Sequence, residues 1–124
     1  MSLENDKEIF ADFVKSQEGK HIRKEDNYYI VSRQIKGKEV VFGKFTDLEC
    51  AKEYERKLVI HGWVAYFSPY VSPYGKYIVK QGRKFYVLRA FSGKKHNFGS
   101  FYNLEDAIRR REELIDDNWG KKKA

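Results

Sequence analysis

The sequence predicts an α+β protein of two tandem units, each a three-stranded antiparallel sheet packed against one α-helix. Three observations predict this fold: an internal repeat, alternating hydrophobicity ahead of each helical stretch, and a Gly-containing tight turn in each copy. A shift of 56 residues aligns 19–63 with 75–119 without a gap, and 16 of the 45 aligned pairs are identical. We therefore interpret the chain as a tandem duplication.

The repeat divides the chain into five segments. They are an N-terminal short amphipathic helix (1–18), a first repeat (19–63), a Pro/Tyr linker (64–74), a second repeat (75–119) and a basic tail (120–124). Ile9, Phe10 and Phe13 recur at helical spacing in the first segment. That helix could pack on a repeat or contact a partner protein, and the sequence leaves both open.

Each repeat is expected to begin with three strands. In the first copy these are 21–24, 28–35 and 38–45, and the second copy has their equivalents, ending at 94–101. Apolar residues alternate along the middle strand, as they do in a half-buried antiparallel strand. Lys36-Gly37 and Ser92-Gly93 have the composition of a two-residue hairpin turn between the second and third strands.

A helix is expected to close each repeat. Asp47 and Asn103 stand where an N-cap side chain would accept backbone N–H groups of the first turn. The second helix carries one stripe at three- and four-residue steps, formed by Leu104, Ala107, Ile108, Arg111, Leu114 and Ile115. Such a stripe can cover the apolar face of the sheet. Trp63 and Trp119 then end the two units.

Composition excludes several classes of protein. The 124 residues contain one cysteine, Cys50, so no internal disulfide can form, and three scattered histidines give no metal-ligand spacing. No apolar stretch approaches the roughly 20 residues of a membrane span. The first residues are acidic, unlike a secretory signal. We expect no cofactor, no metal, no membrane contact and an intracellular, cytoplasmic location.

The formal net charge of +7 is unevenly distributed along the chain. Residues 75–104 contain seven basic and no acidic side chains, whereas 105–119 contain three arginines and six acids. In the first copy, 19–45 carries a net +4 and 46–63 a net −1. Because the sheets are basic and the helices acidic, one sheet face of each unit is expected to meet a polyanion. Lysines that merely protect strand edges are the alternative.

Two short motifs occur in both copies. Val41-Phe42-Gly43-Lys44-Phe45 matches Asn97-Phe98-Gly99-Ser100-Phe101, and Glu49-Cys50-Ala51 matches Glu105-Asp106-Ala107. With the order of elements, they resemble the Apetala-two/ethylene-response-factor type of DNA-binding domain, which has relatives among integrases and homing endonucleases. The resemblance covers both repeats and implies a sheet lying in the DNA major groove, supported from behind by the helix.

The chain departs from that family on the groove face. Val41 and Asn97 stand where the family has a contact tryptophan, and the basic position of the first strand is kept as Arg23 but is Val79 in the second copy. The two copies also differ from each other on this face. An asymmetric site is therefore expected, and no base preference carries over from the family.

The candidate DNA contacts are basic residues of the two sheets. They are Arg23, Lys24, Arg33, Lys38, Lys80, Arg83, Lys84, Arg89, Lys94 and Lys95. Arg33 and Arg89 are equally well explained as structural arginines paired with a helix acid, because alternation places them on the apolar face. Arg109-Arg110-Arg111 is expected to be a solvated, ion-paired face, and Lys121-Lys122-Lys123 a tail that adds non-specific affinity.

These features predict a non-enzymatic protein that binds double-stranded DNA, nucleoid-associated, as a transcription regulator or an accessory module of an integrase or nuclease. A protein–protein module using the linker and a Val41/Tyr86 surface is one alternative. RNA binding shares the charge pattern and would require exposed aromatic residues. No catalytic constellation recurs in the two copies, so no catalytic residues are assigned.

Overall fold

A computed structural model describes residues 3–64 and 71–120. The elements of the first half are α1 (Leu3–Ser16), β1 (Ile22–Glu25), β2 (Tyr28–Ile35), β3 (Lys38–Phe45) and α2 (Leu48–Ile60). Those of the second half are β4 (Ile78–Gln81), β5 (Lys84–Phe91), β6 (Lys94–Phe101), α3 (Leu104–Asp116) and a 3-10 turn, η1 (Asn118–Gly120). The predicted fold class is confirmed, with a three-stranded antiparallel sheet and a helix in each repeat.

The strand register follows the repeat. Both sheets are meanders in the order β1-β2-β3 and β4-β5-β6, and Ile22 pairs with Val31 as Ile78 pairs with Val87. Each middle strand has an irregularity in its pairing with the third strand, after Val31 and between Tyr86 and Leu88. Such bulges increase the local twist of a hairpin, so each sheet can curve around its helix.

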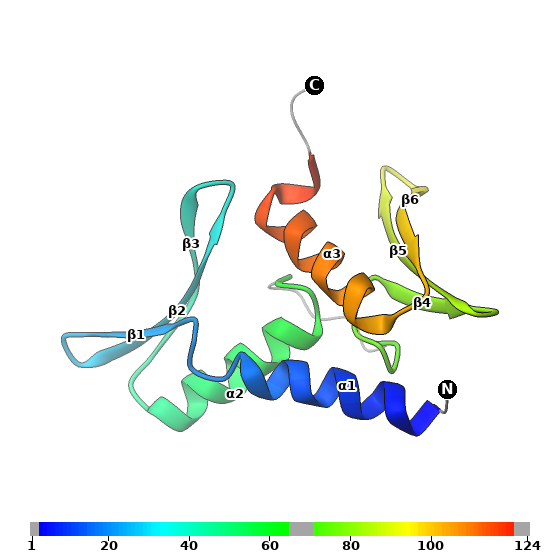
Figure 1. Ribbon diagram of the computed structural model, residues 1–124. Coiled ribbons are helices and arrows are strands. Elements are labelled where there is room, and N and C mark those ends of the chain that lie inside the picture. Colours follow the sequence, from blue (N-terminus) through cyan, green and yellow to red (C-terminus); the bar gives the residue numbers. More distant parts are fainter. Residues whose placement is uncertain (1–2, 65–70, 121–124) are drawn as a thin grey trace.

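The helices α1, α2 and α3 pack together as a helical layer, in which α3 lies between the two sheets and α1 and α2 run beneath it in the view of Figure 1. α2 packs against β2 and β3, α3 packs against β5 and β6, and α3 also contacts β2. α1 lies against both α2 and α3, so the N-terminal helix packs on the two repeats together. Each sheet therefore has an inner face toward the helices and an open face, and the two open faces lie on opposite sides of the helical layer.

One hydrophobic core runs through both repeats. Its fully buried members include Val31 and Leu58 of the first repeat and Ile78 and Val87 of the second. Units of about 45 residues bury too little surface to be stable alone. Because the two repeats share a core, each covers apolar surface of the other.

An aromatic cluster closes each repeat in the same way. The Trp63 ring lies 4.5 Å from His21 and 5.3 Å from Phe42, and the Trp119 ring lies 4.7 Å from Tyr77 and 5.2 Å from Phe98. Both tryptophans are buried and have left-handed φ angles of 63° and 61°. That conformation is costly for a bulky residue, so the packing of the indole must hold it.

The helix starts and the linker show smaller differences from expectation. The Asp47 side chain caps α2 by accepting a hydrogen bond from the Cys50 amide at 3.2 Å, but Asn103 makes no capping bond to α3. The Asn103 amide instead donates to Asp106. In the linker, Ser68-Pro69-Tyr70 lies outside the described residues, as does 121–124, whereas Tyr74 is buried against Phe85.

Candidate nucleic-acid interface

The strand pairing sorts the ten candidate DNA contacts into three groups. Lys24, Arg33, Lys80 and Arg89 lie on inner faces; Arg23, Lys84 and Lys95 lie on open faces; Lys38, Arg83 and Lys94 lie in or beside turns. Open-face residues alternate along a strand with those that enter the core. The ten residues therefore do not share a surface.

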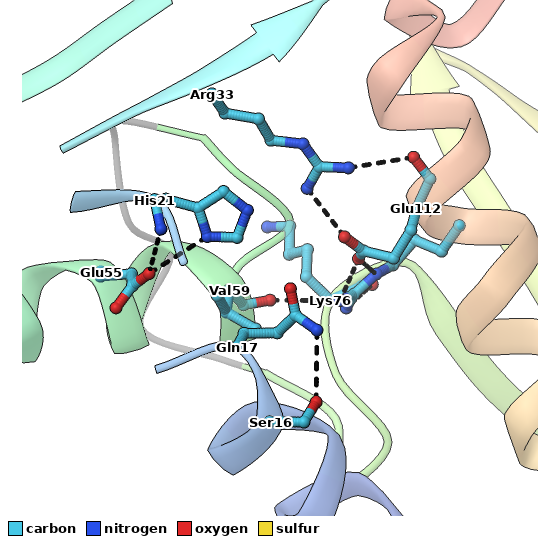
Figure 2. A network of polar contacts seen from close by, with 9 residues as sticks. Ser16, Gln17, His21, Arg33, Glu55, Val59, Lys76 and Glu112 are labelled. Carbon is cyan, nitrogen blue, oxygen red and sulfur yellow. Dashed lines mark hydrogen bonds and ion pairs between the residues drawn. The ribbon is translucent and has the colours of Figure 1, made fainter. Parts of the chain in front are cut away.

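Arg33 points from β2 into the helical layer (Figure 2). Its guanidinium donates to the Glu112 carboxylate at 2.7 Å and to the Glu112 carbonyl at 3.2 Å, and it lies over the Trp63 ring at 5.3 Å. The side chain is only 12% exposed. Arg33 is therefore a structural arginine paired with a helix acid, which is one of the two roles expected from its place on the strand.

Arg89 is the equivalent residue of the second repeat and also faces inward. Its guanidinium lies over the rings of Phe91, Trp119 and Tyr77, at 4.7, 4.9 and 5.5 Å. Stacking of this kind stabilises the charge without a carboxylate. Arg33 and Arg89 thus share a place over the closing tryptophan, which accounts for their identity in the two copies.

The two inner-face lysines also have partners. Lys80 Nζ lies 3.5 Å from the carboxylate of Asp6, which is buried, and 5.3 Å from the Phe85 ring. Lys24 lies 5.7 Å from the ring of Tyr29. Lys80 therefore ties α1 to the second sheet, and both lysines point away from the open faces.

The open face of the first sheet is close to neutral. Arg23 is ion-paired with Glu39, with which it also forms a hydrogen bond, and lies 3.8 Å from Glu25. Lys44 lies over the ring of Tyr28 at 4.8 Å. Tyr28 and Val41 are exposed there. The two cations of this face, Arg23 and Lys44, are therefore matched in number by its two acids, Glu25 and Glu39.

The open face of the second sheet, here called the second open face, is different. Its residues are Val79, Gln81, Lys84, Tyr86, Leu88, Ala90, Lys95, Asn97 and Ser100. None of them is acidic and none belongs to the hydrophobic core. A hollow of about 500 Å³ lies at one side of this face and is lined in part by Val79, Leu88 and Lys95.

The turns around the second open face add to its charge. Arg83 is exposed in the β4–β5 turn, and Lys94 is exposed at the start of β6. Lys84 lies 5.1 Å from the ring of Tyr102, which is 66% exposed. Of the ten candidates, Lys84 and Lys95 therefore remain as cations on the second open face, and Arg83 and Lys94 are exposed at the turns beside it. Val41 and Tyr86 lie on different sheets and do not form one surface.

The sequence prediction for Arg111 is wrong. It was expected on a solvated, ion-paired face, but its side chain is fully buried where the two repeats and α1 meet. It donates to the Val59 carbonyl at 3.2 Å, to the Lys76 carbonyl at 3.3 Å and to the Glu112 carboxylate at 2.6 Å. The place of Arg111 in the apolar stripe of α3 was the signal that could have identified it.

Glu55 is a second buried charge that sequence reasoning missed. Its carboxylate accepts a hydrogen bond from the Gly19 amide at 2.7 Å. It also accepts hydrogen bonds from the His21 amide at 2.9 Å and the His21 ring at 3.1 Å (Figure 2). Burial raises the pKa of Glu55, but these bonds outweigh it and hold the pKa below its ordinary value of 4.5. Glu55 therefore remains ionised and fixes the entry to the first sheet.

Residues 3–64 and 71–120 include no cluster of three or more His, Cys, Asp or Glu side chains that could hold a metal ion. Within the same ranges, no helix has both the length and the apolar character that crossing a membrane requires. No protein-family model, curated protein or solved structure matches the chain.

Proposed function

We propose that the chain binds double-stranded DNA through the second open face. The observation that carries the proposal is the complete lack of acidic residues from 75 to 104, combined with four basic side chains on or beside one open sheet face. A phosphate backbone attracts such a surface whatever its sequence. The first open face, where Arg23 is paired with Glu39, offers no comparable attraction.

The second open face and its turns carry charged groups suited to phosphates and neutral polar groups suited to base edges. Arg83, Lys84, Lys94 and Lys95 would contact phosphates, which position a protein on the duplex. Tyr86, Asn97 and Ser100 present hydroxyl and amide groups between them, and such groups can bond to base edges. A strand pair is narrow enough to enter the major groove.

The arrangement of the sheets limits how DNA can bind. Because the two open faces lie on opposite sides of the helical layer, one straight duplex cannot lie along both. We therefore expect one duplex per chain, held by the second repeat. Four phosphate contacts would give a slope of about −3 to −4 for log K against log salt.

The experiment compares two double variants with the same change in net charge. Lys84→Glu with Lys95→Glu reverses charge on the second open face, and Lys38→Glu with Lys44→Glu does so on the first sheet. Fluorescence anisotropy with a random-sequence duplex at several salt concentrations measures affinity. We expect the first pair to weaken binding by about tenfold or more and the control pair by less than about threefold. Equal losses would contradict the proposal.

A second candidate, single-stranded nucleic acid, is favoured by one observation. Tyr102 is 66% exposed beside Lys84, and an exposed ring next to a cation is a place where an unpaired base can stack. Titrating single-stranded DNA and RNA beside the duplex distinguishes the two. Tighter single-strand binding that falls in Tyr102→Ala would replace the duplex proposal.

A further inference from the structure

A groove runs between α1 and α2, which belong to the first half of the chain. The second open face belongs to the second half. The groove encloses about 570 Å³ and its floor is apolar, formed by Phe10, Val14, Val59, Ile60 and Pro73. The residues of α1 that line it run from Lys7 to the end of the helix, about three turns. An apolar groove of this length along two helices has the shape that accepts a third helix.

The groove is preformed, because α1 is held in place from its other side. Asp6 is buried and pairs with Lys80, and the ring of Phe13 lies 5.8 Å from the buried guanidinium of Arg111. The Phe10 ring occupies the space beside Gly75, where a Cβ atom would lie 2.7 Å from it. A partner would therefore meet a fixed surface, which lowers the entropic cost of binding.

The charged residues on the two helices are sorted around this groove. The basic residues lining it are Lys7 and Lys15 of α1 and Lys52 and Arg56 of α2. Glu8 and Asp12 of α1, and Glu49 and Glu53 of α2, do not line it. Both helices thus turn basic side chains toward the groove and leave these acids elsewhere.

The two acids that do line the groove leave three of these four cations without an ion pair in the described part of the chain and the lining with a net positive charge. Glu55 is buried and its carboxylate is bonded to Gly19 and His21. Glu18 lies 3.8 Å from Lys52. Among the described residues, no ion pair is formed by Lys7, Lys15 or Arg56. The rim is therefore a net positive border around an apolar floor.

We infer that the α1–α2 groove is a docking site for an acidic amphipathic helix of a partner protein. The apolar face of that helix would lie on the floor, and its Asp and Glu residues would lie against Lys7, Lys15, Lys52 and Arg56. The inference is independent of DNA binding, since none of these residues lies on the second open face.

The test uses three synthetic 18-residue peptides with the full-length chain. One is a helix with Leu at i, i+3, i+4 and i+7 and Glu at the flanking positions; one is its twin with Lys in place of Glu; one is a scrambled acidic peptide of the same composition. Isothermal titration measures binding. We expect the acidic helix to bind at least about tenfold tighter than either of the others.

Two variants locate the binding. Lys52→Glu with Arg56→Glu should weaken the acidic helix by about tenfold or more and improve binding of the lysine twin. The matched control, Lys20→Glu with Lys57→Glu, makes the same change in net charge away from the groove and should have little effect. Ala11→Trp fills the groove without changing charge and should abolish binding, with circular dichroism reporting that the fold is retained.

Several outcomes would overturn the inference. They are no binding of the acidic helix, equal binding of the scrambled peptide, or equal losses in the groove and control variants. Tight binding of dodecanoate without binding of the peptide would also overturn it and assign the groove to a small anionic amphiphile.

Discussion

The two repeats differ in a buried charge of the helix and in the residues of their open faces. Positions 55 and 111 are equivalent and both are buried, yet one is Glu and the other Arg. Glu55 accepts hydrogen bonds from Gly19 and His21 within the first repeat. Arg111 instead reaches the Val59 carbonyl of the other repeat. The carboxylate at position 55 therefore stabilises its own repeat, whereas the guanidinium at the equivalent position 111 links the two repeats.

The same kind of difference separates the two open faces. Glu39 of the first sheet, which pairs with Arg23, stands where the second sheet has Lys95. Val79 stands in place of Arg23. The first face is therefore internally balanced, while the second is not. Arg111 of the junction and Lys84 and Lys95 of the second open face all stand at positions where the two copies differ.

The largest expected effect comes from breaking the junction. Arg111→Met removes a buried cation together with its hydrogen bonds to the Glu112 carboxylate and to the Val59 and Lys76 carbonyls. We expect the free energy of unfolding to fall by about 3–5 kcal/mol, measured by urea denaturation. Arg109→Met, on the exposed side of the same helix, should cost less than about 0.5 kcal/mol. Similar losses in both variants would contradict a linking role for Arg111.

A smaller effect is expected at Glu55. Glu55→Gln should lower stability by about 1–3 kcal/mol at pH 7, because the charged acceptor of three hydrogen bonds is lost. The pKa of Glu55 is held below 4.5 in the folded chain, so its contribution is present above that pH and is lost as the pH falls through the folded value.

The difference between the native chain and Glu55→Gln should therefore shrink as the pH falls below about 4.5. Thermal unfolding between pH 3 and 7 checks this. Glu53→Gln, exposed on the same helix, is the control and should follow the native chain throughout. A gap of constant size across this range would argue against an ionised, hydrogen-bonded carboxylate.

The smallest expected effect tests the open faces directly. Glu39→Lys gives the first sheet the residue that the second has at this place and releases Arg23 from its ion pair. If cations on an open face attract DNA, duplex affinity should rise by about threefold to tenfold at low salt. Gln34→Lys on the same face changes the charge without releasing Arg23 and should raise affinity less. No change in either variant would contradict the electrostatic account.

The sequence predicted the strands and helices well, because the duplication supplied two independent copies of each pattern. The alternation of apolar residues and the hairpin glycines predicted β2, β3, β5 and β6, and the N-cap residue Asp47 predicted the start of α2. The sequence could not show whether a residue that is identical in both copies has a structural or a binding role. Arg33 and Arg89 are the same in both copies because each covers a closing tryptophan, so identity between copies was a poor guide to the interface.

The apolar stripe of α3 indicated that Arg111 is buried, but local patterns did not predict the partners of the buried charges. Glu55 and Arg111 find their partners 36 and 52 residues away, at Gly19 and Val59. The Glu55 environment arises where α2 packs on the entry to the first sheet, and the Arg111 environment arises where one repeat packs on the other. For the same reason, the groove between α1 and α2 has no signature in either helix alone, since its basic rim comes from both.

The position of α3 sets the order in which the chain can fold during synthesis. The amide of Lys36 donates to the carbonyl of Asp116, and α1 packs on α3, so segments of the first half depend on a helix that follows them in the sequence. Until α3 has formed, the first sheet and α1 each have apolar surface that α3 does not yet cover. The two repeats are therefore expected to fold together in one late step, at a rate limited by contacts distant in sequence.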